Sequence, residues 1–494
     1  MKTIIVIFIG LTFSLTCVGQ PATKVEIPNT PAGKRLTDWL LVFAGGNQDS
    51  FTVFIARNYD KSLLAEDSAY DLADRQARRY MDAKSYVIRS LETSRDNEIT
   101  VIAQSSMTEL WFRITMKVKP DLPHKITEYT AQRIPPPEGT QKQLSEKELV
   151  AKVEQFMDRL VAEDAYSGTL LIAKGGKTLF KRAYGLASKA YNAPITIDTK
   201  LNLASIGKMF TAIAIAQLME QKRLSLTDTV GTYLPQYPNE QVRRKVTIHH
   251  LLTHSSGLGD YHGSGYICSK GVLRQVKDYF PLFEKDTLAF EPGAKCQYSN
   301  AGYIILGAII EKVSGENYFD YIRNHIFEAV GMPNTDFYET DIDVPNRATG
   351  YTNFVDKGND YFEFHLGERR NTSLYSGVKG IPAGGAFSTA DDLLRFTQAL
   401  KSHKLVSAET FKLMTTNKIF FRKYDTSEDY YGYGFELEVT GGKRVIGHGG
   451  GDLGISSGVR MYPDAGDYTL IILSNYDRGG ILVNYKIQEM LTQY

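Results

Sequence analysis

The sequence predicts an α+β protein. We expect an antiparallel sheet flanked by helices, a mainly helical lobe beside it, and a small α+β domain before both. The chain has 494 residues and is 43% hydrophobic, which is enough for two domains with sizeable cores. Strand patterns occur near both ends of the second part of the chain, and the long stretch between them has mainly helical patterns.

The first 19 residues have the pattern of a secretory signal peptide. Lys2 precedes an apolar run at 4–15, and small residues follow before Gln20. The apolar run is too short to span a bilayer. We therefore expect an exported protein, periplasmic or secreted, with no membrane span in the mature chain. The net charge of +1 gives no electrostatic reason to expect nucleic-acid binding.

Residues 20–140 are expected to form the small α+β domain. Helical patterns fill the segment 30–80, and period-two alternation indicates four strands in the segment 85–134. This order of elements resembles the cone-shaped nuclear-transport-factor-2-like domains. No cluster of acid, base and nucleophile occurs here, so we expect a spacer or binding role. A run of prolines at 135–137 then marks a stiff linker.

Residues 148–494 are expected to form the second domain. Ser145 and Glu148 make a capping box for a helix, and the strands 168–174 and 177–184 follow with a two-glycine turn between them. At the other end of the chain, the patterns predict three strands and a final helix, at 444–446, 457–462, 468–474 and 481–491. Both ends would build one antiparallel sheet, and the insert would form a second lobe, with the site between the lobes.

The strongest candidate for chemistry is Ser205-Ile206-Gly207-Lys208, which opens an apolar stretch at 209–219. That stretch has little polarity around its circumference, so it predicts a helix buried on all sides. Residues three apart share one helical face, which would bring the Lys208 amine to the Ser205 hydroxyl. Burial disfavours the ammonium form, so Lys208 would act as a base near neutral pH. The alternative is that Ser205 only caps the helix and Lys208 reaches solvent.

Three other patterns are weaker. Ser376 and Lys379 have the same spacing as the first motif, but they lie among glycines with no helical period after them. The segment 454–458 fits the serine elbow of α/β-hydrolases, but no histidine follows it as that fold requires. The glycines of 449–454 match a dinucleotide fingerprint, but a strand pattern follows where a helix is needed. We therefore expect no cofactor.

The histidines and cysteines do not indicate a metal site. His249, His250 and His254 have no carboxylate between them in a zinc-binding arrangement, so we interpret them as packing and capping residues. Removal of the signal peptide would leave Cys268 and Cys296, which allow one disulfide but have no C-x-x-C spacing.

Three motifs together resemble a known family. They are Ser205-Ile206-Gly207-Lys208, Tyr298-Ser299-Asn300 and His448-Gly449-Gly450. Their order is that of the serine β-lactamase and penicillin-binding-protein superfamily, in its class C-like branch of esterases, D-amino-acid peptidases and carboxypeptidases. The resemblance covers residues 148–494.

The resemblance implies roles for the first two motifs. Ser205 would form the acyl-enzyme, and Lys208 and Tyr298 would share the transfer of its proton, in a division that stays open. Nearby cations such as Lys208 would be needed to lower the pKa of the Tyr298 phenol. Asn300 would hold Lys208 and the substrate amide. The structural interpretation of the second motif is a helix cap, and the motif can have the cap and the catalytic role together.

The third motif would line the cleft. Gly450 would let the substrate backbone approach closely, and the N–H of Gly451 would complete an oxyanion hole with that of Ser205. His448 stands where many β-lactamases have lysine. A neutral imidazole binds a carboxylate less strongly than an ammonium does, so efficient turnover of β-lactams or D-Ala-D-Ala is not expected. A purely structural His448 is the alternative.

These observations predict an exported, metal-independent serine hydrolase that acylates Ser205 with an ester, an amide of a D-amino-acid peptide, or a lactam. Its partner would be a small-molecule or peptide substrate, and cell-wall fragments are candidates. A non-catalytic peptidoglycan or ligand sensor is the alternative, with residues 20–140 as its interaction part. The complete motifs argue against it, since a binder does not need both Lys208 and Tyr298.

Overall fold

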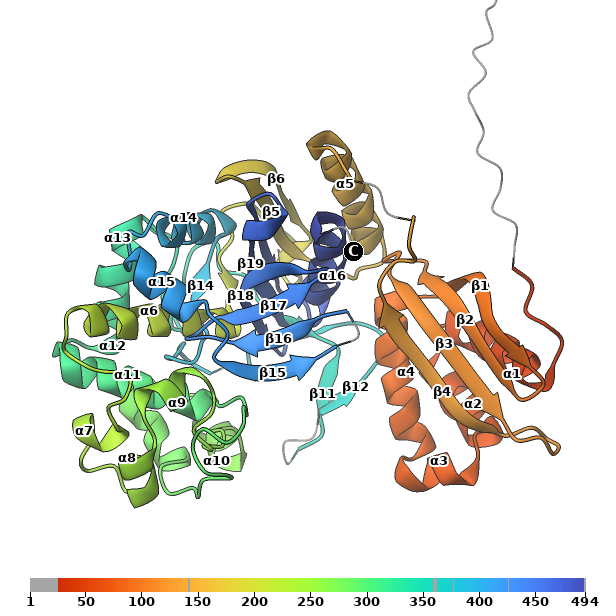
Figure 1. Cartoon of the computed structure of the whole chain (residues 1–494), viewed down its shortest axis with the longest axis horizontal. Helices are drawn as coiled ribbons and strands as arrows, with labels where there is room; N and C mark the ends of the chain where they lie inside the picture. Colours follow the sequence, from red (N-terminus) through yellow and green to blue (C-terminus); the bar gives the residue numbers. More distant parts are fainter. Residues whose placement is uncertain (1–24, 141–142, 359–361, 376, 425, 493–494) are drawn as a thin grey trace, which may run out of the picture.

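The computed structural model describes residues 25–140, 143–358, 362–375, 377–424 and 426–492. The predicted signal peptide lies outside these residues. Figure 1 shows a small domain with its own sheet, in red and orange, beside a larger domain that contains the rest of the chain. In the described ranges, no helix has both the length and the apolar character needed to cross a lipid bilayer.

In the described residues, the small domain consists of four helices and then four strands; the order of helices before four strands is the predicted one. The helices are α1 (Pro31–Ala44), α2 (Gln48–Asn58), α3 (Lys61–Glu66) and α4 (Ala69–Ala83). The strands β1 (Tyr86–Arg95), β2 (Glu98–Ser105), β3 (Trp111–Val118) and β4 (Ile126–Ile134) pair in chain order as an antiparallel sheet. Each helix begins at a side chain that accepts a hydrogen bond from its first turn, namely Thr30, Asn47, Asp60 and Ser68. The core between helices and sheet is centred on the buried Trp39.

The large domain is built on one eight-stranded antiparallel sheet, in the order β15-β16-β17-β18-β19-β20-β5-β6. The predicted strands are β5 (Gly168–Lys174), β6 (Lys177–Tyr184), β18 (Lys443–Asp452), β19 (Ile455–Tyr462) and β20 (Tyr468–Ser474). β20 pairs with β5, so the two ends of the domain meet in one sheet.

Three strands at one edge of this sheet were not predicted. They are β15 (Ile419–Lys423), β16 (Glu428–Tyr431) and β17 (Glu436–Thr440). They are short and carry charged residues among aromatic ones, so no clean period-two alternation marks them. They nevertheless matter for the site, because β17 pairs with only the first part of β18 and leaves one edge of its last residues without a neighbouring strand.

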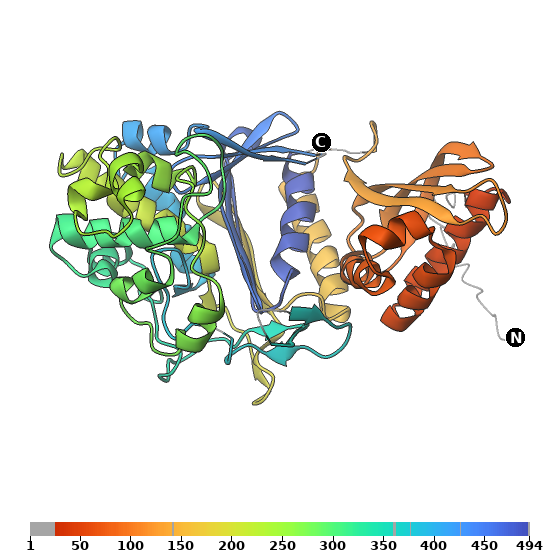
Figure 2. The same ribbon diagram turned by 90° about the horizontal axis from the view of Figure 1, so that it is seen from below.

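Helices cover both faces of the sheet. α5 (Glu146–Ala162), which has the predicted capping box, and α16 (Gly479–Thr492) pack on one face. The helical lobe packs on the other through α6 (Gly207–Glu220), α11 (Asn300–Ser314) and α14 (Ala390–Lys401). Figure 2 shows the sheet nearly edge-on between these layers. The fold is therefore α+β.

Smaller elements complete the large domain. The other helices are α7 (Val230–Tyr233), α8 (Glu240–Lys245), α9 (Ile248–Leu252), α10 (Ser264–Ser269), α12 (Tyr318–Ile322), α13 (Glu328–Val330) and α15 (Ala408–Met414). The short strands are β7 (Leu186–Ser188), β8 (Ala193–Pro194), β9 (Leu201–Asn202), β10 (Tyr351–Thr352), β11 (Phe354–Asp356), β12 (Phe362–Phe364), β13 (Arg370–Asn371) and β14 (Phe387–Ser388).

The two domains are held together by apolar and charged contacts. β12 of the large domain places Phe364 in the core of the small domain, where Gln48 donates a hydrogen bond to its carbonyl oxygen at 3.3 Å. Arg478, just before α16, forms an ion pair with Asp82 of α4. The small domain therefore docks beside the face of the sheet that α5 and α16 cover (Figure 2).

Candidate active site

Ser205 lies on a single 3-10 turn, η1 (Ala204–Ile206), that leads directly into α6. Ala204 has a φ of 43°, a left-handed conformation that is unfavourable for a residue with a Cβ. Its N–H donates to Asn202 Oδ1 at 2.8 Å. Gly384 packs so closely that a Cβ there would lie 2.3 Å from the Ala204 carbonyl oxygen. The surrounding chain thus holds the strained turn that presents Ser205.

Lys208 is fully buried in the apolar wall behind Ser205. Its Nζ lies 3.1 Å from Ser205 Oγ, 2.7 Å from Asn300 Oδ1 and 2.6 Å from the carbonyl oxygen of Ala383. Burial lowers the pKa of Lys208 to about 7, although the charges of Asp260 and Glu436 act to raise it. Much of Lys208 is therefore a neutral amine near pH 7.

The partners of Lys208 also orient this amine. A neutral amine has two N–H bonds, and Asn300 Oδ1 and the Ala383 carbonyl oxygen can accept both. Its lone pair is then left for the hydroxyl proton of Ser205. The arrangement suits removal of that proton.

Asn300 links Lys208 to a carboxylate that sequence analysis did not single out. The Asn300 side-chain amide donates to Asp260 Oδ2 at 2.8 Å. Asp260 Oδ1 lies 3.0 Å from Nδ1 of His262. Burial acts to raise the pKa of Asp260, but the hydrogen bond from His262 and other contacts outweigh it, and the pKa is lowered. The sequence gives Asp260 no role of its own, and only the fold shows that it orients Asn300.

Tyr298 lies beside Ser205, whose side chain acts to lower the pKa of the phenol, and its ring centroid lies 4.7 Å from Nζ of Lys208. The ring of His254 packs against it at 4.2 Å, and Nδ1 of His254 accepts the N–H of Ser299 at 3.1 Å. Burial raises the pKa of Tyr298 well above its ordinary value. This direction is opposite to the lowering that sequence analysis expects from nearby cations, so the phenol is protonated at neutral pH.

Ser299, His249 and His250 have the capping and packing contacts that the sequence analysis expected. The Ser299 hydroxyl caps α11 by accepting the N–H of Gly302 at 3.2 Å. His250 forms a reciprocal cap with Thr247, and Nδ1 of His249 lies 2.8 Å from the hydroxyl of Tyr433. Cys268 and Cys296 are free thiols, so the disulfide that the sequence allows is not formed.

The last residues of β18 have a backbone N–H, that of Gly451, that is free to bind an oxyanion. The first residue of β17, Glu436, pairs with Gly447. Because the two strands are antiparallel, the residues of β18 after Gly447 have no pairing partner on β17. In an antiparallel strand, the N–H groups of alternate residues point to the same side. Glu436 Oε2 accepts the N–H of Gly449 at 3.1 Å. By the same alternation, the N–H of Gly451 points past the end of β17, beside the cavity that Gly451 and Ser205 both line.

Gly450 has a structural role in the contact between β18 and the turn that carries Ser205. A Cβ at Gly450 would lie 2.0 Å from the carbonyl oxygen of Leu203 and 3.3 Å from the Cβ of Ala204. The absent side chain therefore lets β18 approach the turn that carries Ser205. The close neighbour of Gly450 is the protein's own backbone, while a contact of Gly450 with the substrate stays a prediction.

The contacts of His448 favour the structural alternative. The ring is buried, with Nε2 2.7 Å from the hydroxyl of Tyr431 and Nδ1 2.5 Å from the carbonyl oxygen of Gly449. Burial lowers the pKa of His448 to about 4, so the imidazole is neutral. A carbonyl oxygen only accepts, so Nδ1 carries the proton and Nε2 accepts from Tyr431. Both nitrogens are occupied, as in the structural alternative.

The cavity beside Ser205 has a volume of about 160 Å³. Of the predicted site residues, Ser205, Asn300 and Gly451 line it. Aromatic rings form much of the remaining wall, from Tyr261, His262, Tyr266, Tyr279 and Phe387. A second cavity, of about 220 Å³, lies between the two domains near Trp111 and Lys486, and its described lining contains no pairing of nucleophile and base.

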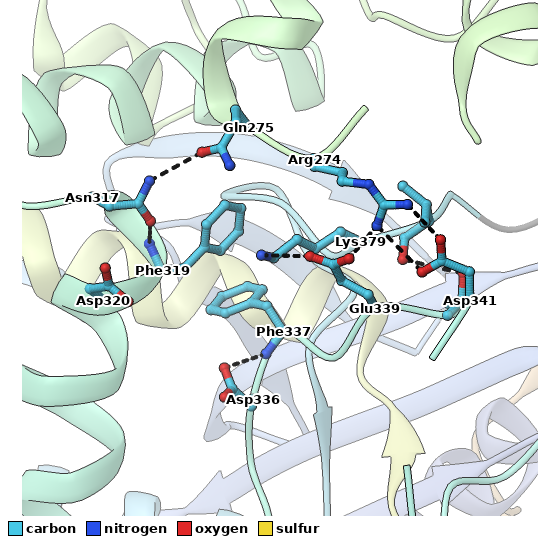
Figure 3. A network of polar contacts seen from close by, with 12 residues as sticks. Arg274, Gln275, Asn317, Phe319, Asp320, Asp336, Phe337, Glu339, Asp341 and Lys379 are labelled. Carbon is cyan, nitrogen blue, oxygen red and sulfur yellow. Dashed lines mark hydrogen bonds and ion pairs between the residues drawn. The ribbon is translucent and has the colours of Figure 1, made fainter. Parts of the chain in front are cut away.

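The other lysine in the same four-residue pattern, Lys379, has very different neighbours (Figure 3). Its Nζ lies 3.2 Å from Glu339 Oε1 and 4.3 Å from the ring centroid of Phe319. Arg274 binds the same glutamate and also Asp341. Lys379 therefore pairs with a carboxylate, whereas Lys208 contacts a hydroxyl and two neutral oxygens.

Comparisons with known proteins identify the family of the large domain. Residues 150–488 match the family model described as Beta-lactamase. Penicillin-binding protein 4* from Bacillus subtilis is 32% identical over 332 residues, which cover 65% of this chain and 71% of that protein. D-aminopeptidase from Brucella anthropi is 26% identical over 286 residues, 57% of this chain and 51% of that protein. The crystal structure of the penicillin binding protein from Bacillus halodurans has a TM-score of 0.59 and 30% identity, and the match covers 67% of this chain and 98% of that one. With the family match spanning the large domain and the Ser205 and Lys208 pair at its centre, the chain belongs to the beta-lactamase family and is a serine hydrolase.

Proposed function

We propose that this protein cleaves an ester or amide bond through an acyl-enzyme formed on Ser205. The observation that carries the proposal is the buried amine of Lys208, 3.1 Å from the Ser205 hydroxyl, with two acceptors directing its lone pair toward that oxygen. A nucleophilic serine needs an adjacent base, and this amine has the pKa and position of one.

Acylation would begin when Lys208 takes the Ser205 proton and Oγ attacks the substrate carbonyl carbon. The N–H groups of Ser205 and Gly451 would stabilise the negative oxygen of the tetrahedral intermediate. Tyr298, which rests as a neutral phenol, would give its proton to the leaving group and recover one from Lys208. Water would then attack the ester carbonyl, and the reverse proton transfers would release the acid and regenerate Ser205.

The proposed substrates are esters and amides, including amides of D-amino acids, in preference to β-lactams. His448 is neutral and buried, so the position that carries lysine in many β-lactamases supplies no cation for a substrate carboxylate. The similarity to a D-aminopeptidase supports the amide class. Export, proposed from the pattern at 1–19, would bring the enzyme to cell-wall peptides. The non-catalytic sensor has less support, since it gives no role to the buried Lys208 amine 3.1 Å from the Ser205 hydroxyl.

Mass spectrometry of the intact protein tests the nucleophile. After brief exposure to a fluorophosphonate or a nitrophenyl ester, we expect one adduct per chain in the wild type and none in Ser205→Ala. The Ser205→Ala variant should also lose activity by at least about 1,000-fold. An adduct of the same yield in Ser205→Ala would refute the assignment.

A further inference from the structure

The wall of the cavity beside Ser205 has an uneven distribution of charge. Among its described lining residues, the ionisable groups other than tyrosines are His262 and Asp452. His262 already contacts Asp260 at 3.0 Å, and this contact raises the pKa of His262. No lysine or arginine is among the described lining residues, because Lys208 lies behind Ser205. The carboxylate of Asp452 is therefore the main charge without an ion-pair partner in this wall.

The strand places Asp452 next to the proposed oxyanion donor, Gly451. Asp452 ends β18 and directly follows Gly451, the proposed oxyanion donor. Consecutive Cα atoms lie about 3.8 Å apart. Side chains two apart in a strand point to the same face, so Asp452 shares the face on which Gly450 meets the Ser205 turn. A carboxylate here is within reach of a group on the carbon next to the substrate carbonyl.

The neighbours of Asp452 leave part of its carboxylate available. Oδ1 accepts the N–H of Leu453 at 2.8 Å, and the side chain is exposed at the cavity. Desolvation by the surrounding protein raises the pKa of Asp452, while the N–H of Leu453 and the nearby charges of His262 and Lys270 act to lower it. Lys270 donates to the carbonyl oxygen of Tyr375 at 3.2 Å. An arriving cation would lower the pKa of Asp452 further and so favour the carboxylate.

We propose that Asp452 binds the protonated amino group of the substrate, so that the enzyme prefers amino-acid amides and esters with a free α-amino group. The inference rests on the proposed function and narrows it. The aromatic wall formed by Tyr261, Tyr266 and Tyr279 suits both an apolar side chain and the ammonium, since ring faces attract cations. Asp452 would thus determine specificity, while Lys208 and Ser205 carry out the chemistry.

The test compares two amides that differ in one group. D-Alanine p-nitroanilide carries the ammonium, and propionyl p-nitroanilide lacks it at nearly the same size. The wild type should have a higher kcat/KM for the first, and Asp452→Asn should lower that value by about 10- to 100-fold, the loss expected for one hydrogen bond to a charged group. Hydrolysis of the propionyl compound should stay unchanged. Asparagine keeps an oxygen for the Leu453 N–H, so the turn should be preserved.

The control variant is Asp356→Asn on β11, since Asp356 also accepts a loop N–H, from Gly358 at 2.7 Å, but is not among the residues that line this cavity. It should leave both substrates unaffected. The preference for the amine should also decline above pH ~8, where an α-amino group loses its proton. Equal losses on both amides in Asp452→Asn, or no preference in the wild type, would overturn the inference.

Labelling of Ser205 separates this failure from failure of the proposed function. If the fluorophosphonate still labels Ser205 and the wild type hydrolyses both amides equally well, only the role of Asp452 is wrong. If Ser205 is not labelled and neither amide is cleaved, the acyl-enzyme proposal fails, and the inference fails with it.

Discussion

Lys208 and Lys379 end two copies of the same four-residue pattern, but the fold gives them opposite surroundings. Lys208 is fully buried among apolar residues and touches only neutral oxygens. Lys379 is partly exposed and paired with Glu339. The difference shows that the chemistry of the pattern depends on burial and on the absence of a direct counter-charge. Those conditions come from the helix that follows the pattern and from loops distant in sequence.

The largest effect expected from this comparison is the loss of the Lys208 amine. Lys208→Met should lower kcat/KM by about 100- to 10,000-fold, the usual contribution of a general base. The thermal midpoint should stay the same or rise, because methionine is apolar and removes a buried polar amine. Steady-state kinetics and calorimetry check both outcomes. Loss of activity together with a large fall in the midpoint would instead indicate a structural role for Lys208.

A second prediction uses the charge that acts on Lys208 from β17. The wild-type kcat/KM should rise with pH through about 7, because Lys208 must lose its proton to act as a base. The charge of Glu436 acts to raise the pKa of Lys208. Glu436→Gln removes that charge, so the acid limb of the pH profile should move to lower pH.

The same residue also positions β18, and a second variant separates the two roles. Glutamine keeps an oxygen for the Gly449 N–H, so the plateau rate of Glu436→Gln should change little. Glu436→Ala leaves this N–H without its acceptor, and the plateau should fall by about 10-fold. Glu438→Gln, two residues along β17, is the control and should move neither quantity. An acid limb that stays in place in Glu436→Gln would show that this charge does not affect the base.

Local patterns made much of the fold predictable. Ser145 and Glu148 start α5 through side chains three residues apart, and β5 and β6 are separated by two glycines, so these signals lie within a few residues. Ser205 and Lys208 could be found in the same way. Tyr298 and Asn300 needed the order of motifs along the chain as well.

The residues that sequence analysis missed act through space. Asp260 orients Asn300 from a loop 40 residues earlier, and Glu436 of β17 contacts Gly449 of the neighbouring strand β18. His448 was assigned to the substrate by its resemblance to the family's third motif, and its buried partner, Tyr431, lies on a strand that has no clear pattern. Such contacts depend on tertiary packing, so neither spacing nor composition signals them.

The smallest expected effect completes the comparison of the two lysines. Lys379→Met removes an ion pair with Glu339 at a partly exposed site, where such pairs contribute up to about 1 kcal/mol. Arg274 still holds the same glutamate, so the network of Figure 3 should persist. The kcat/KM should stay within about 2-fold of the wild type, and the free energy of unfolding should fall by no more than about 1 kcal/mol. Denaturant unfolding and steady-state kinetics measure both. A loss of activity comparable to that of Lys208→Met would mean that the four-residue pattern, and not its burial, determines which lysine acts as the base.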